Sequence, residues 1–138
     1  MTKQQDFSMW SVNFILFCLA NFLYYGAFYL YIPVLPQYVE MLGGTPADIG
    51  LVGGAFGLSS FIIRPYLGKL ANEWGRKRMM LLGTISFALL FLLFGRVTGV
   101  VPLVVLRLAH GVCLAMYLAA SAAYIAAVSY THLRAHET

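Results

Sequence analysis

Charged residues are scarce in this sequence, and its first long stretch has none. Only 10% of the residues are Asp, Glu, Lys or Arg, whereas about a quarter is typical of soluble globular domains. No charged side chain occurs from Phe7 to Val39, and the mean hydropathy of the chain is +0.79. An ordinary soluble domain is therefore excluded, and the composition predicts an integral membrane protein.

Cysteines and catalytic groupings are also few. Cys18 and Cys113 both lie in apolar tracts, which favours a packing role over a disulfide framework. We find no serine–histidine pair, paired carboxylates or metal-ligand cluster that would support catalysis, so we expect no enzyme, no metal and no cofactor. The net charge of +4 comes from Lys and Arg at the ends of apolar tracts. That pattern sets membrane topology and does not indicate a nucleic-acid partner.

Four apolar tracts are long enough to span a bilayer, since about 20 helical residues cross the hydrocarbon core. The first tract is longer than the core of a signal peptide and lacks a small-residue cleavage site, so we expect it to remain in the protein. The sequence predicts an all-α integral membrane protein with a lead-in over residues 1–9 and transmembrane helices over about 10–32, 46–69, 79–95 and 102–127.

Prolines mark the expected helix boundaries. Pro33 and Pro36 are expected to end the first helix, because proline lacks the N–H that continues a helix. Thr45 is suited to cap the second helix, with Pro46 in its first turn. Pro65 is expected to interrupt the second helix near its end.

The basic residues concentrate in one short stretch, Gly68–Arg78, which carries four of the nine Lys and Arg residues. Loops rich in Lys and Arg stay in the cytoplasm. The loop over residues 37–48 contains Glu40 and Asp48 but no Lys or Arg, which fits the opposite side. We therefore expect a multi-pass protein of the plasma membrane with a cytoplasmic amino terminus.

The spacing within Gly68–Arg78 is more informative than its charge. The residues that carry the pattern are Gly68, Leu70, Asn72, Glu73, Gly75, Arg76 and Lys77. The stretch resembles the loop between helices 2 and 3 of the major facilitator superfamily, G-x-L-A-D-[RK]-x-G-[RK]-[RK], with Asn72 in place of the Asp and Glu73 in place of the next basic residue. Gly68 is expected to let two helix ends approach, and Gly75 to form the turn. The alternative is any membrane hairpin that follows the positive-inside rule.

Two further motifs resemble the same superfamily. Arg107, His110 and Gly111 resemble its R-x-x-x-G signature at the start of helix 4, where the slot of His110 is often Gln. Pro33 and Pro36 resemble a P-x-x-P phrase of its drug-exporting branch. The resemblance implies the first four of twelve helices and efflux of a small molecule by alternating access. The expected partners are the lipid bilayer, the substrate, protons and the missing carboxy-terminal helices.

Two arginines lie inside apolar tracts, where a buried cation costs about 2.5–3.5 kcal/mol. Arg64 is near a helix end, so it either extends to the membrane surface or pairs with Glu73 or a partner helix. Arg107 lies deeper, and we expect it to face protein or a water-filled cavity; the alternative is extension to the outer headgroups. The resemblance implies a proton-relay role for Arg107. His110 shares its face and either joins that relay or is a hydrogen-bonded packing residue.

Two helices carry small residues at three- and four-residue spacing, which permits close packing between membrane helices. We expect both faces to contact a neighbouring helix. One face lies in the second helix and consists of Gly50, Gly53, Gly54 and Gly57. The other lies in the fourth helix and consists of Gly111, Ala115, Ala119, Ala123 and Ala127.

The first helix presents a polar and aromatic face made of Asn21, Tyr24, Tyr25 and Phe28. The resemblance makes the first and fourth helices the pair that lines the substrate cavity. Such a wall suits an amphiphilic or cationic ligand through stacking and cation–π contacts; the alternative is plain packing. The first, third and fourth helices contain no acidic residue, so the carboxylate that many proton-driven exporters carry in the membrane is missing from this part of the sequence.

Residues 128–138 do not continue the membrane pattern and resemble a translated adapter sequence. We therefore expect the fourth helix to end near Ala127, and we exclude His132 and His136 from any metal site.

A second hypothesis is a complete four-helix membrane protein that oligomerises, as a small multidrug exporter or an assembly subunit. Small multidrug exporters resemble this chain in size but depend on a glutamate in the first helix, where this chain has none.

Overall fold

The computed structural model describes the backbone of residues 12–136 and the side chains of residues 12–126, and over this range it is all-helical. The predicted all-α fold with four membrane-spanning helices is confirmed. The expected lead-in over residues 1–9 lies outside the described residues. A short additional helix, α2 (Val34–Met41), joins the first two spans. The spans are α1 (Val12–Tyr31), α3 (Pro46–Trp74), α4 (Arg76–Phe94) and the first part, Val100–Ala126, of α5 (Val100–His136).

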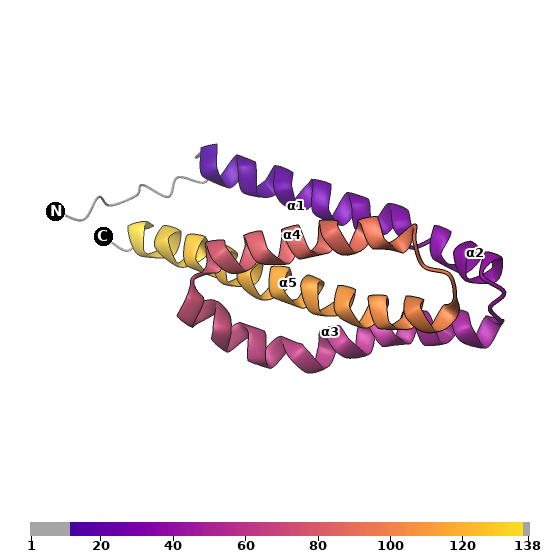
Figure 1. Ribbon diagram of the computed structural model, residues 1–138. Coiled ribbons are helices and arrows are strands. Elements are labelled where there is room, and N and C mark those ends of the chain that lie inside the picture. The colour runs from indigo at the N-terminus through magenta and orange to yellow at the C-terminus, as the bar shows by residue number, and fades with distance from the viewer. Residues whose placement is uncertain (1–11, 137–138) are drawn as a thin grey trace.

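The bundle is organised around α5. Both α3 and α4 pack against it along much of their length. Helix α1 lies at the edge of the bundle (Figure 1), where its aromatic side chains contact rings of α4 and α5. In the most apolar stretch of α5, 50% of the residues are buried, compared with 11% in α1. The start of α1 and the α3–α4 turn lie at one end of the bundle, and α2 lies at the other (Figure 1).

The small-residue face of α5 packs against α3 as predicted. Gly111 and Ala115 are buried, and a Cβ added at Gly111 would collide with the Ser59 hydroxyl and the Phe56 carbonyl of α3. Only glycine therefore permits this approach of the two backbones. Farther along the same face, Ala119 and Ala123 are half-buried, and the side chain of Ala127 lies outside the described residues.

The glycine face of α3 contacts no other helix within the described residues, so its contact with a neighbouring helix stays a prediction. A Cβ would meet nothing within 4 Å at Gly50, Gly53, Gly54 or Gly57. These glycines lie on the opposite side of α3 from the buried Val52 and Ala55, because the helix turns once in 3.6 residues. A close approach that we did not predict occurs at Gly83 of α4, where a Cβ would lie 3.1 Å from the Tyr117 nitrogen of α5.

The prolines after α1 do more than end a helix. The first span ends at Tyr31, as expected, but Pro33 then forms the N-cap of α2 and Pro36 lies within α2. Proline is tolerated in the first turn because its missing N–H would have no partner there. The Tyr38 hydroxyl of α2 donates to the Phe94 carbonyl 2.6 Å away, which joins α2 to the end of α4.

Thr45 caps α3 as predicted. Its hydroxyl accepts a hydrogen bond from the Asp48 N–H, and the Asp48 carboxylate accepts one from the Thr45 N–H at 2.7 Å. Pro46 is the first residue of the helix. The start of α3 is thus specified locally, by a reciprocal capping box.

The end of α3 differs from the prediction. The helix passes through Pro65 and continues to Trp74, so the expected interruption and the expected end near residue 69 are both wrong. Membrane helices tolerate an internal proline because nearby groups satisfy the freed carbonyl, and α3 curves without breaking (Figure 1). Gly75 alone separates α3 from α4, with φ of +90°.

The end of α5 also differs. The helix continues to His136, past the expected end near Ala127. No glycine or proline occurs after Gly111, so no residue of low helix propensity breaks it. The side chains of His132 and His136 lie outside the described residues.

Candidate functional site

The loop signature lies on a turn at one end of the bundle. Gly75 forms this turn as predicted, and Leu70 is half-buried. No described residue lies within 4 Å of a Cβ added at Gly68, so the close approach expected there stays a prediction. Arg64 does not pair with Glu73, since nine positions of one helix separate them by about 13 Å of rise. The polar members of the signature, Asn72, Glu73, Arg76 and Lys77, are all exposed.

Arg107 lies inside the bundle and does not extend to the headgroups. Its side chain is 3% exposed. The Nε donates to the Val52 carbonyl of α3 at 3.3 Å. The guanidinium carbon lies 4.2 Å from the centre of the Phe56 ring and 5.8 Å from that of Tyr31, within the range of cation–π attraction. Among the described residues no carboxylate pairs with it, so a main-chain oxygen and aromatic faces stabilise the cation.

His110 lies on the same face of α5 as Arg107, as their spacing predicts. It is fully buried, and its Nδ1 lies 3.3 Å from Arg107 Nη1. Its other ring nitrogen, Nε2, has no hydrogen-bond partner among the described residues. Rings from three other helices surround the imidazole, with centroids 4.5 to 6.4 Å away: Phe28 and Tyr31 of α1, Phe56 of α3, and Phe87 and Phe94 of α4.

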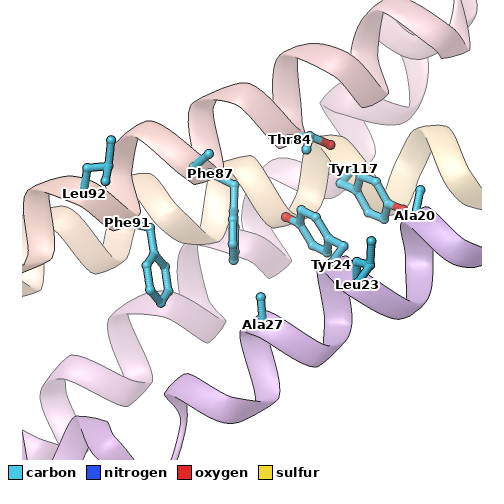
Figure 2. A pocket seen from close by; sticks show the side chains of 10 residues that line it. Ala20, Leu23, Tyr24, Ala27, Thr84, Phe87, Phe91, Leu92 and Tyr117 are labelled. Atoms are coloured by element: carbon cyan, nitrogen blue, oxygen red, sulfur yellow. The ribbon is translucent and has the colours of Figure 1, made fainter.

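A groove of about 540 Å³ lies between α1, α4 and α5. Tyr24 of α1 stacks on Tyr117 of α5, with 4.0 Å between ring centroids and 7° between ring planes. Both hydroxyls are buried without a hydrogen-bond partner among the described residues. Figure 2 shows Phe87 and Phe91 of α4 directed toward α1 across the groove. The groove walls carry no charged side chain.

The residues predicted to line a cavity do not form one wall. Tyr24 lines the groove, whereas Phe28 packs against Phe56 and His110. Asn21 turns back on its own helix, where its Nδ2 donates to a main-chain carbonyl 2.8 Å away. Tyr25 is half-buried and meets Tyr117 edge-on. Their part in a substrate cavity stays a prediction.

Three contributors to this region were not predicted. Tyr117 follows His110 by seven residues, or two helical turns, so helical spacing from His110 was the signal that could have found it. The position of Phe87 depends on how α4 packs against α5. Val52 contributes its backbone carbonyl, which its residue type does not reveal.

Comparison with known proteins places these features in context. Residues 17–135 match the Major Facilitator Superfamily. The quinolone resistance protein NorA of Staphylococcus aureus strain MRSA252 is 37% identical over 106 residues, which cover 77% of this chain and 27% of that protein. Multidrug resistance protein 2 of Bacillus subtilis strain 168 is 33% identical over 100 residues, 72% of this chain and 25% of that protein. The chain thus spans about a quarter of the length of these relatives. No solved structure matches it.

Proposed function

Because the chain belongs to the Major Facilitator Superfamily, a family of transporters and not of enzymes, we propose that it is part of a secondary active transporter that exports a small molecule by alternating access. The observation that carries this proposal is the family match over residues 17–135, combined with relatives whose names denote drug resistance. Those names describe the relatives. Only export, as the direction of transport, is extended from them to this chain.

The chain supplies the first part of a longer protein in this proposal. Its aligned region covers 27% of one relative and 25% of another, and its four spans correspond to the first four of twelve helices. Further helices then complete the substrate cavity. The competing hypothesis is a four-helix protein that oligomerises, and no contact of the described residues favours it.

The proposed substrate is amphiphilic or cationic. The support is the uncharged aromatic groove built around Tyr24, Tyr117 and Phe87, since aromatic faces attract both apolar groups and cations. Protons are the proposed coupling ion, with Arg107 as the participating cation. No acidic residue occurs in α1, α4 or the described part of α5, so the carboxylate of such a relay would come from the rest of the protein.

The proposed location is the plasma membrane, with a cytoplasmic amino terminus. The α3–α4 turn exposes Arg76, Lys77 and Arg78, and such basic loops remain in the cytoplasm. The opposite end of the bundle exposes Glu40 of α2.

Recovery and expression of the complete gene tests the proposal. The reading frame downstream of Val128 is sequenced, and the full-length protein is produced in a bacterial strain that lacks its own major exporters. We expect energy-dependent efflux of the cationic dye ethidium that stops when an uncoupler dissipates the proton gradient. A frame that encodes no further membrane helices would favour the four-helix hypothesis. Efflux that persists after uncoupling would exclude proton coupling.

A further inference from the structure

The contact between Arg107 and His110 determines which imidazole nitrogen carries the proton. The two atoms, Arg107 Nη1 and His110 Nδ1, are 3.3 Å apart. A guanidinium has only N–H donors and no acceptor. The Nδ1 must therefore be the acceptor and carry no hydrogen, which places the proton of the neutral ring on Nε2.

The surroundings of His110 oppose a doubly protonated ring. A doubly protonated ring would put two N–H groups, each bearing positive charge, against each other in a site with no exposed surface, and like charges repel most strongly where water is excluded. The Nε2 has no hydrogen-bond partner among the described residues, and the neighbours of the imidazole from other helices are aromatic rings. The nearest ring is that of Phe87, with 4.5 Å between centroids.

We propose that His110 is a positioning residue for Arg107: its unprotonated Nδ1 accepts a hydrogen bond from Nη1 and thereby fixes the orientation of the guanidinium beside the Val52 carbonyl. With Nε bonded to Val52 of α3 at one edge and Nη1 bonded to His110 at another, the planar guanidinium is held at two points. The importance of this orientation for transport rests on the proposed function, whereas the hydrogen bond itself does not.

This role differs from that of a proton relay. A relay histidine takes up a proton, and on this imidazole the only free site for a proton is the Nδ1 that faces Arg107. Protonation would therefore break the contact with Arg107. The groups that face the ring from α1, α3 and α4 are Phe28, Tyr31, Phe56, Phe87 and Phe94, and none of them is a carboxylate that would favour an imidazolium.

The first experiment is nitrogen NMR of the full-length protein with ¹⁵N-labelled histidine near neutral pH. His110 is assigned by the signals lost in His110→Phe, or in His110→Asn if the first variant does not fold. We expect a neutral ring with the proton on Nε2 and an Nδ1 signal displaced by an accepted hydrogen bond, and we expect that displacement to disappear in Arg107→Met or Arg107→Leu, which carry no side-chain donor. A proton on Nδ1, a doubly protonated ring, or an Nδ1 signal that is unchanged in both arginine variants would overturn the proposal.

The second experiment measures dye efflux by the same variants. His110→Phe keeps a ring of similar size and removes the acceptor, so we expect the maximal rate to fall about tenfold, the effect of losing one hydrogen bond to a charged group. His110→Asn retains an acceptor near the Nδ1 position and should recover most of the rate, and in the Arg107→Lys background His110→Phe should add little. Leu108→Phe, which alters the neighbouring outward position, is the matched control. An equal loss of efflux rate in His110→Phe and His110→Asn would contradict positioning through Nδ1. Absence of efflux from the unmodified protein would instead refute the proposed function, and the NMR test of the hydrogen bond would still stand.

Discussion

Arg107 Nε donates a hydrogen bond to the Val52 carbonyl oxygen across the α3–α5 interface, with 3.3 Å between the two atoms. The acceptor belongs to the main chain, so no substitution of the Val52 side chain removes it. A cation inside an apolar span costs about 2.5–3.5 kcal/mol. This bond, the His110 contact and the Phe56 ring face offset part of that cost, and they do so without neutralising the charge.

The first prediction is that this retained charge is needed for transport. Arg107→Ala in the full-length protein should abolish dye efflux, because it removes the buried charge. Expression and membrane insertion should remain intact, because a cation is costly to insert into an apolar span and alanine is not. Arg107→Lys should recover only part of the rate, since a point charge replaces a planar fork. Arg96→Ala, at an exposed position in the turn after α4, is the control. Normal efflux by Arg107→Ala would show that the signature R-x-x-x-G is a coincidence of spacing.

Parts of the fold were predictable because they depend on local chemistry. The four spans follow from long apolar tracts, and the Thr45 cap and the Gly75 turn follow from residue types with strong local preferences. Periodicity identifies the glycine face of α3 but not what covers it, and within the described residues no other helix does. Gly111 and Gly54 look equivalent in the sequence; only the packing shows that Gly111 contacts α3, whereas Gly54 contacts no other helix in the described part of the chain.

The candidate site was predictable to a similar extent. Helical spacing places Arg107 beside His110, and the structure has them in contact. The acceptor on Val52 and the ring of Phe87 could not be inferred, because the first is a backbone atom and the second depends on the angle at which α4 crosses α5. Residues that belong to one helix were thus easier to associate than residues brought together by packing.

A second prediction concerns the close helix contacts. Gly111→Ala should lower the free energy of unfolding by about 1–3 kcal/mol, because the added methyl group meets the α3 backbone and forces the helices apart. Gly83→Ala should cost less, since its neighbours lie 3.1 Å or more from the added atom. Gly54→Ala, where the methyl group meets no described residue, should cost least. Thermal unfolding of the three purified full-length variants in detergent measures this order, and equal stability of Gly111→Ala and Gly54→Ala would contradict the α3–α5 packing.

The third prediction is the orientation in the membrane. In a background with Cys18 and Cys113 replaced, a cysteine at the exposed Met41 should react with an impermeant maleimide added to intact cells, and a cysteine at the exposed Lys77 should react only after the cells are opened. The reason is the concentration of Arg and Lys at the α3–α4 turn. Labelling of Lys77→Cys from outside would reverse the proposed topology.

The fourth prediction concerns the two departures from the family pattern at the exposed α3–α4 turn. Asn72 accepts hydrogen bonds but brings no charge, so it should weaken the ion-pair contact that the superfamily's Asp implies at this turn. Asn72→Asp should shift the full-length transporter toward its outward-open state, as measured by distances between spin labels on the cytoplasmic helix ends. If that population is unchanged while Glu73→Gln impairs transport, Glu73 has taken over the role.

The last prediction concerns the stacked tyrosines of the groove. Tyr117 is 2% exposed, and its hydroxyl has no partner among the described residues, although buried hydroxyls are nearly always hydrogen-bonded. We expect the partner to come from the remaining helices, so Tyr117→Phe should lower the free energy of unfolding of the full-length protein by about 1 kcal/mol. The substitution keeps the ring that stacks on Tyr24 and removes only the hydroxyl, which isolates the effect of the lost bond. Tyr29→Phe, whose side chain is 65% exposed, is the control. Unchanged or higher stability of Tyr117→Phe would show that the hydroxyl is unpaired in the complete transporter and that the later helices leave this part of the groove open.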